Sequence, residues 1–196
     1  SKESNSETVE GVDVTNVCGV VGVGWKTEAI SADLDVSAFC LGVDGHINEM
    51  TDFVYYNSSN KYVQEGEDGS RPFSADGAVN GAIDAIDEME GPYFDLHQEV
   101  EGDVKDLWVQ FDEVSENIKE IIIVVTIHNK GLTFSDVSGS YCRVWNGHKE
   151  LCRYTMSEDF SNEDAVEIGK FTRDGVIEID GEEYPAGEWS FTPIGK

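Results

Sequence analysis

The chain has 196 residues, with 40 Asp and Glu against 13 Lys and Arg, and a formal net charge of −27. This charge excludes a nucleic-acid backbone or an anionic membrane surface as the expected partner, because both need a basic protein surface. Apolar residues at 39% and aromatic residues at 10% are enough for a folded core, so general disorder is excluded as well. A compact chain this acidic repels itself, so we expect salt, a basic partner or bound cations to offset the charge.

The N-terminal segment and the cysteines predict a cytoplasmic protein. Residues 1–10 are polar and lack the apolar stretch of a signal peptide, and the longest apolar run, Ile121–Ile127, is too short to span a membrane. The cysteines show no CxxC pair and no Cys/His spacing that suits zinc. They are Cys18, Cys40, Cys142 and Cys152. We therefore expect reduced thiols rather than disulfides.

Short apolar stretches rich in Val, Ile, Phe, Tyr and Trp recur along the chain, as expected of strands. In chain order they are Val14–Trp25, Ser37–Val43, Phe53–Tyr56, Leu107–Phe111, Ile121–Ile127, Tyr141–Trp145, Leu151–Met156, Val166–Thr172, Val176–Ile179 and Trp189–Ile194. Tight turns are predicted at Asp44-Gly45, Asn146-Gly147, Asp174-Gly175 and Asp180-Gly181. This pattern predicts an all-β fold, a β-sandwich of two mainly antiparallel sheets in a single domain, 1–196.

Two strands and two short helices carry more specific expectations. Leu107–Phe111 and Ile121–Ile127 are apolar on nearly every residue, which predicts strands that are buried on both faces or covered by a loop. Asn80–Met89 contains good helix formers with apolar residues at helical spacing, and Asp112–Lys119 has Val114 and Ile118 four residues apart. We expect one or two short helices at these places.

The strand pattern lapses between Glu65 and Asp106, and we interpret 65–106 as an acidic inserted loop region. Long structureless stretches inside a compact domain are uncommon and are usually functional or mobile. Residues 84–106 contain one base, Lys105, and nine acids. The acids are Asp84, Asp87, Glu88, Glu90, Asp95, Glu99, Glu101, Asp103 and Asp106. The segment is either a solvated, negatively charged loop or a site for a hard cation.

The most specific candidate for such a site is the run Asp33-Leu34-Asp35-Val36-Ser37-Ala38. On a strand, Asp33, Asp35 and Ser37 project from one face. Two carboxylates about 6.6 Å apart on one face repel each other unless a cation or base lies between them, and no base lies near in sequence beyond Lys26. An EF-hand loop is excluded, because its sixth position would be Ala38 instead of Gly. The run predicts either a calcium site or a polar strand face.

No catalytic site is predicted. The sequence has no GxSxG elbow, no HExxH and no P-loop. Gly19, Gly22 and Gly24 do not have dinucleotide-binding spacing and indicate a strand with close backbone packing. His128 follows the Ile121–Ile127 strand, where a hydrogen-bonded imidazole at a strand end is the favoured interpretation. The protein is therefore predicted not to be an enzyme.

Several motifs in order resemble the TerD family, the tellurium-resistance and stress-response domain. They are Val21-Gly22-Val23-Gly24-Trp25, Asp33–Phe39, Asp52–Asn57, Val124–His128, Arg153-Tyr154, Glu158–Ser161 and Gly187–Phe191. The resemblance covers residues 11–64 and 107–196 well. It implies a calcium-binding β-sandwich, cytoplasmic and without established catalysis.

The same resemblance implies a set of calcium ligands. Asp33 and Asp35 match the first element of the family site, Asp103 resembles the end of the second, and Asn57 matches an asparagine that would lend a carbonyl. The family's Gly-Asp-Asn run has no clear counterpart in the rewritten segment 65–101, where other acids would replace it. These replacements are Asp84, Asp87, Glu88 and Asp95.

Three departures from the family pattern bear on function. Asn129 stands where an acid usually follows the middle strand, Ser1–Glu10 matches the first strand poorly, and Gly175–Tyr184 looks inserted. A missing first strand would leave an open sheet edge, which another protein would cover.

Two function hypotheses follow. One is a calcium-binding stress-response domain whose acidic loop is ordered by metal and engages another protein. The alternative is that the chain is a structural subunit, braced by calcium, of an oligomer or large assembly such as a virion.

Overall fold

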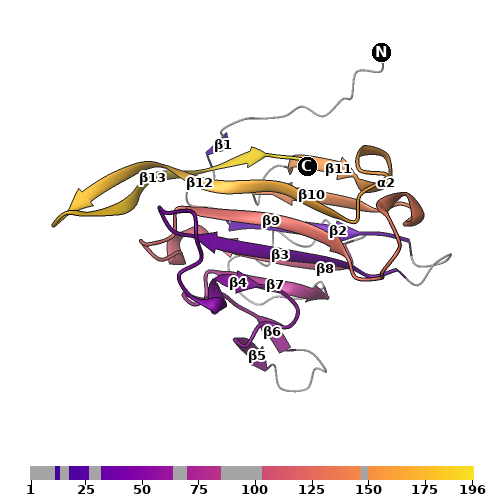
Figure 1. The fold of residues 1–196 in the computed structure, drawn as a ribbon, viewed down its shortest axis with the longest axis horizontal. Coiled ribbons are helices and arrows are strands. Elements are labelled where there is room, and N and C mark those ends of the chain that lie inside the picture. The colour runs from indigo at the N-terminus through magenta and orange to yellow at the C-terminus, as the bar shows by residue number, and fades with distance from the viewer. Residues whose placement is uncertain (1–11, 14–17, 27–31, 64–69, 85–102, 147–149) are drawn as a thin grey trace, which may run out of the picture.

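The computed structural model describes residues 12–13, 18–26, 32–63, 70–84, 103–146 and 150–196. Two antiparallel sheets pack face to face, and a short two-stranded ribbon extends from one side (Figure 1). The expected all-β sandwich is confirmed.

One sheet has the strand order β1-β13-β12-β9-β3-β4. The bounds are β1 Val12–Asp13, β13 Glu182–Pro193, β12 Ala165–Ile179, β9 Glu120–Ile127, β3 Leu34–Leu41 and β4 Phe53–Val54. The other sheet has the order β11-β10-β2-β8-β7. Its bounds are β11 Glu150–Thr155, β10 Tyr141–Trp145, β2 Cys18–Gly24, β8 Lys105–Gln110 and β7 Val79–Asp84.

The ribbon pairs β5 (Lys61–Val63) with β6 (Ser70–Pro72). In the described part of the chain, helical structure is short. It consists of α2 Met156–Asp159 and the 3-10 turns η1 Met50–Asp52, η2 Phe111–Glu113 and η3 Phe134–Asp136. The helical segment predicted at Asp112–Lys119 is found only at its start, in the turn η2, and the prediction was wrong for residues 114–119, which form no helix.

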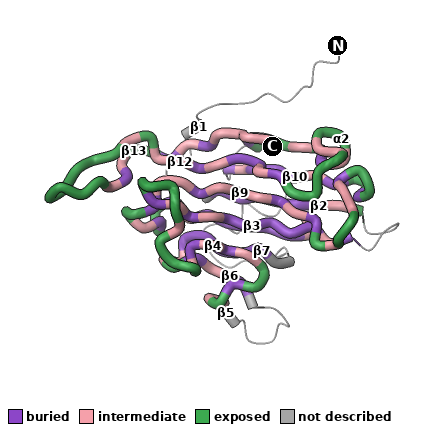
Figure 2. Tube along the Cα trace, in the orientation of Figure 1, coloured by how far each residue is buried: buried purple, intermediate pink, exposed green. Residues whose placement is uncertain are grey.

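The core lies between the two sheets, along the buried stretches in Figure 2. β3 places Leu34, Val36 and Ala38 in this core, as its period-two pattern requires. β8 is buried from Lys105 to Val109, which confirms the prediction of burial on both faces. The same prediction was wrong for β9, where buried and half-buried residues alternate because one face of this sheet is less covered.

β10 and β11 pair as a hairpin on either side of the turn predicted at Asn146-Gly147, whose residues 147–149 lie outside the described residues. Cys142 is opposite Tyr154 and Val144 is opposite Cys152, so the two cysteines are not a directly opposed pair. Cys40, Cys142 and Cys152 are free thiols, as expected of these three positions.

The turn predicted at Asp174-Gly175 was wrong. Gly175 lies within β12, where the register with β13 shifts between Arg173 and Gly175 at a β-bulge. A bulge accommodates one extra residue and bends the strand without ending it. The turn at Asp180-Gly181 is confirmed: both residues have positive φ, and Ile179 pairs with Glu182 across it.

The segment that looked inserted, Gly175–Tyr184, is therefore the outer part of the β12–β13 hairpin. β12 pairs with β9 as far as Thr172, opposite Glu120, and then continues beyond it. The hairpin projects from the sandwich as an arm, which we define as residues 174–188 (Figure 1).

The helix predicted at Asn80–Met89 is replaced over its first residues by β7, which pairs with β8. Gly81 and Ala82 have φ values of 129° and 64°, which no right-handed helix admits. Strand pairing with β8 satisfies the buried backbone here, so tertiary contacts override helix propensity. Residues 85–89 lie outside the described residues. The strand-free stretch expected between Glu65 and Asp106 instead contains β6, β7 and the start of β8.

Residues 1–10 also lie outside the described residues, so the expected polar N-terminal segment has no structural account. β1 pairs with Ser190 and Phe191 of β13. A two-residue strand therefore lies along this edge of the six-stranded sheet.

Candidate cation site

An ammonium lies between the two carboxylates that the sequence singled out. Asp33 and Asp35 stand at the start of β3, and Lys105 is the first residue of β8 in the opposite sheet. The Lys105 Nζ is 2.7 Å from Asp33 Oδ1 and 2.7 Å from Asp35 Oδ1. The side chains of Lys105 and Asp35 are 9% and 12% exposed, whereas that of Asp33 is 50% exposed. The pair that was expected to need a cation has one supplied by the chain.

The start of β3 is held by the segment that follows β9. The backbone N–H of His128 donates to the Asp33 carbonyl at 2.8 Å, and the Asp33 N–H donates to Asn129 Oδ1 at 2.8 Å. Asn129 therefore positions Asp33 through its side-chain oxygen. This contact gives a structural role to the position where the family usually has an acid.

His128 links Asp35 to a row of aromatic rings. Its Nδ1 is 3.4 Å from Asp35 Oδ2, and its ring meets that of Tyr56 edge-on at 5.6 Å. The row continues through Tyr55 and Phe53 toward β3, with Phe53 stacked on Tyr55 at 4.4 Å. The row of aromatic rings therefore ends at His128, which contacts the carboxylate of Asp35. Asn57, the predicted carbonyl ligand, is exposed next to Tyr56.

The pKa of Lys105 shows that the ammonium stays charged at neutral pH. Burial acts to lower its pKa, but the hydrogen bonds to Asp33 and Asp35 outweigh burial and raise the pKa above its ordinary value. The three groups therefore form a charged cluster at the end of the sandwich where β3 begins.

Asp103, another predicted ligand, forms a buried ion pair. Arg143 binds it through Nε and Nη2, with the shortest distance 2.7 Å, and the two side chains are 5% and 2% exposed. The Tyr141 hydroxyl donates to Asp103 Oδ1 at 2.7 Å. Burial, together with the Asp103 hydrogen bond, raises the pKa of Tyr141. Both oxygens of Asp103 therefore have protein partners.

Gly22 makes room for this ion pair. It lies on β2 opposite Arg143 on one side and Asp106 on the other, and a Cβ at this position would overlap the Asp103 carboxylate. The prediction that these glycines lie on a strand is confirmed, and at Gly22 the close neighbour is a side-chain carboxylate.

The substitution Gly22→Ala is expected to destabilise the protein by about 1–3 kcal/mol, the range for overpacking a filled site. Chemical denaturation of the variant measures this loss. Gly45→Ala is a poor control because of its positive φ, so Gly42→Ala serves as the reference, since Gly42 has no positive φ and an added Cβ would meet only side-chain atoms, at 3.3 Å or more. Wild-type stability in Gly22→Ala would show that Asp103 is free to move.

The remaining predicted ligands are only partly described. Asp84 ends β7, and its Cα is paired with that of Lys105, so its backbone adjoins the charged cluster. Asp87, Glu88 and Asp95 lie outside the described residues, and their role as ligands stays a prediction. Within the described ranges, no three His, Cys, Asp or Glu side chains come together as a metal cluster.

Sequence reasoning missed the bases that neutralise these acids. Besides Lys105 and Arg143, Arg71 of β6 binds the buried Asp106 at 3.0 Å and Asn80 of β7 at 2.7 Å. Asp106 is 0% exposed, so this pair is internal as well. The sequence contained one signal for them. Lys105 is the single base among nine acids, and Arg143 lies inside an apolar strand, and a base in either setting is suited to neutralise a buried acid.

The comparison with family models decides the identity. The TerD domain model matches residues 8–196. The chain belongs to the TerD family. Two curated relatives support this: Tellurium resistance protein TerD of Serratia marcescens is 30% identical over 185 residues, and General stress protein 16U of Bacillus subtilis (strain 168) is 31% identical over 185 residues. These matches cover 90% of this chain and 79% and 78% of the TerD-family relatives.

A solved structure has the same fold. It is a homologue of the telluride resistance protein TerD from Streptomyces coelicolor A3(2), with a TM-score of 0.58 and 20% sequence identity. The alignment covers 92% of this chain and 89% of that one. Across the described residues, no helix has the length and apolar character needed to cross a membrane.

Proposed function

We propose that this chain is a non-enzymatic, cytoplasmic stress-response domain that binds calcium at the Asp33–Asp35 end of the sandwich and engages another protein. One observation carries the proposal: two carboxylates, Asp33 and Asp35, lie side by side at this end, both in contact with Lys105. Asp33 directly precedes β3, Asp35 lies on β3, and the backbone of Asp84 adjoins Lys105 on β8. The names of the curated relatives refer to resistance and stress, which supports the physiological part.

The donor chemistry supports calcium as the ion. Calcium takes six to eight oxygen ligands, and carboxylates are its preferred protein donors. Asp33 is half exposed and accessible to an ion, and Asp35 lies beside it on the same strand face. The net charge of −27 favours cation binding in general. Asp103 is bound by Arg143 and Tyr141, so we propose that it stabilises this end of the sandwich and does not bind the ion itself.

Calcium is expected to stabilise the protein. When free calcium reaches about 100 times the dissociation constant, the linkage between binding and folding adds about 2.7 kcal/mol to the free energy of unfolding. Thermal unfolding in millimolar calcium and in chelator measures the effect, which corresponds to several degrees. The double substitution Asp33→Asn/Asp35→Asn is expected to abolish it, and to lower the metal-free melting temperature as well, because the nearly buried Lys105 loses both counter-charges. Identical melting temperatures in calcium and in chelator would contradict calcium binding.

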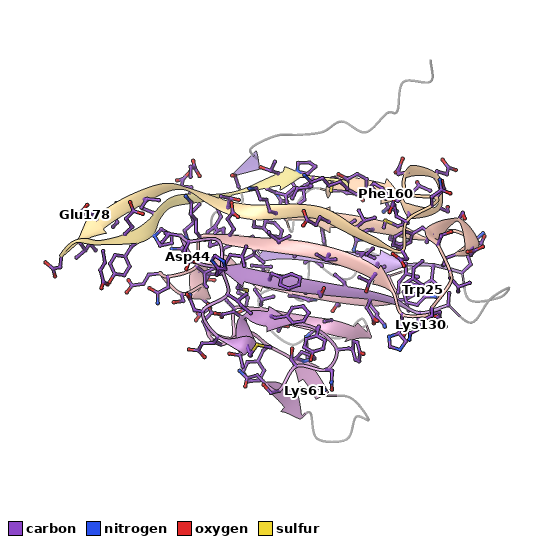
Figure 3. All side chains as sticks on the ribbon, viewed as in Figure 1. Trp25, Asp44, Lys61, Lys130, Phe160 and Glu178 are labelled. Carbon is purple, nitrogen blue, oxygen red and sulfur yellow. The ribbon has the colours of Figure 1, made fainter. Side chains whose placement is uncertain are left out.

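The arm is the surface we propose for the protein partner. Val176, Ile177 and Ile179 are 42%, 49% and 52% exposed, which is unusual for three large apolar residues on one hairpin. Residues 174–195 contain six acids and no base. Ile177 and Ile179 share one face of the strand, and an apolar surface of this kind bordered by acids fits a partner whose apolar surface is bordered by Lys and Arg. Glu178 on the arm lies at the opposite end of the molecule from Trp25 and Lys130 (Figure 3).

The same arm is the observation that favours the alternative, a structural subunit of a large assembly. Mass photometry of the protein from its native source separates the two functions. A free monomer, or a complex with one different protein, supports the stress-response domain. A fixed high-order complex supports the assembly subunit. In either case, Ile177→Ser/Ile179→Ser is expected to reduce the complex, whereas Val43→Ser, which removes another exposed apolar side chain, is the matched control.

A further inference from the structure

Lys105 occupies the position where a cation would neutralise Asp33 and Asp35. Its ammonium hydrogen bonds to one oxygen of each carboxylate at 2.7 Å. It comes from the opposite sheet, 70 residues along the chain from Asp35, so the contact is tertiary. The side chains of Lys105 and Asp35 are 9% and 12% exposed, so their contact is shielded from the screening that weakens surface ion pairs.

An ion and this ammonium compete for the same two carboxylates. Calcium binds carboxylate oxygens at about 2.3–2.6 Å, and Lys105 already holds Oδ1 of both residues. Two cations in contact with one carboxylate pair also repel each other strongly where water is scarce. An ion that binds the two Oδ1 atoms therefore requires Lys105 to leave the pair, which its flexible four-carbon stem permits, and an ion on the Oδ2 atoms would be weakened by the ammonium beside it.

We infer that Lys105 is an intramolecular competitor of calcium at the Asp33–Asp35 pair and sets how tightly this chain binds the ion. The inference rests on the proposed function, since it concerns the same site. In the metal-free protein, Lys105 supplies the neutralising charge, so the fold does not depend on calcium. Removal of the ammonium should convert the pair into a tighter calcium site and make the fold depend on the metal.

Calorimetric titration of calcium chloride into the full chain tests this inference at fixed ionic strength. Lys105→Met removes the charge and keeps much of the stem, and its calcium affinity is expected to rise at least about tenfold over wild type, because charge count tunes calcium affinity. Lys170→Met is the matched control. Lys170 also pairs with a carboxylate, Glu120, at 2.9 Å, but on β12. The calcium affinity of the Lys170→Met variant should equal that of wild type.

A second readout is stability without metal. In chelator, Lys105→Met is expected to melt below wild type, because Asp35 is left nearly buried beside Asp33 without its counter-charge. Calcium should restore more stability to this variant than to wild type. Lys105→Arg keeps the charge and should show no gain in affinity. If Lys105→Met does not fold in chelator, Lys105→Gln is used for the same titration.

The outcomes separate the inference from the proposed function. If Lys105→Met binds calcium more tightly and Asp33→Asn/Asp35→Asn in that background removes the gain, the inference holds. Equal affinities of wild type and Lys105→Met overturn the inference and leave calcium binding intact. If only Lys105→Met binds, the inference stands and the proposed calcium function of the native chain fails. If no variant binds calcium, both fail.

Discussion

The substitution Arg143→Met is expected to lower the free energy of unfolding by about 3–5 kcal/mol, the cost of breaking a buried ion pair by removing one partner. Arg143 and Asp103 are 5% and 2% exposed, and Arg143 donates to both oxygens of the carboxylate. Without the guanidinium, the Asp103 charge keeps the Tyr141 hydroxyl but loses its counter-ion. Urea denaturation followed by fluorescence measures the loss.

Arg153 provides the matched control, because it lies directly opposite Arg143 on the neighbouring strand. Its partner is Glu150, and the two side chains are 46% and 39% exposed. Arg153→Met should therefore cost no more than about 1 kcal/mol, as exposed ion pairs do. The double variant Arg143→Met/Asp103→Leu should recover much of the stability, since it leaves no buried charge. Equal losses in Arg143→Met and Arg153→Met would contradict the buried pair.

Stability is expected to fall steeply above about pH 9. Burial raises the pKa of Cys40 and of Cys142 well above the ordinary 9.0, and burial with the nearby Glu150 raises that of Cys152 to about 12. Each folded-state pKa is above that of the unfolded chain, so the unfolded thiols lose protons first. The contribution of these thiols to the free energy of unfolding is complete below pH 9.0 and is lost as the pH rises toward their folded-state pKa values. Each thiol lowers the free energy of unfolding by about 1.4 kcal/mol per pH unit in that window.

Denaturation between pH 8 and 11 measures this slope. Three such thiols give about 4 kcal/mol per pH unit at the steepest point. Cys152→Ala should have a shallower slope by one thiol, with little change at pH 8. Tyr154, whose pKa burial raises to about 12, extends the loss beyond pH 10 in both proteins. A slope unaffected by Cys152→Ala would show that this thiol ionises equally in the folded and unfolded chains.

The local sequence pattern predicted strands correctly where the pattern of apolar residues matches the pattern of burial. β3 and β8 were predicted by their residue types, and their buried faces follow from the side-chain alternation and the apolar run. The Asp180-Gly181 turn was predicted from a dipeptide that accepts positive φ at both positions. The same dipeptide chemistry failed at Asp174-Gly175, because a bulge also suits Gly and the long β12–β13 pairing continued through it.

The helix expected from Asn80 shows the limit of propensity. Ala82 and its neighbours favour helix locally, but pairing with β8 and the Arg71–Asn80 hydrogen bond select a strand. These partners lie 9 residues away or more along the chain, so no local window contains the information.

The sequence by itself determined the all-β sandwich, the family, the free thiols that are described and the carboxylate pair Asp33–Asp35. These depend on side-chain period, turn chemistry and residue order, which are properties of short segments. Only the tertiary structure decided which cation lies at the pair. The Asp35–Lys105 contact spans 70 residues and the Asp103–Arg143 contact 40, because packing of two sheets joins strand ends that are remote in sequence. Charge counting predicts that counter-ions are needed, and the packing of strands β3, β8 and β10 assigns them.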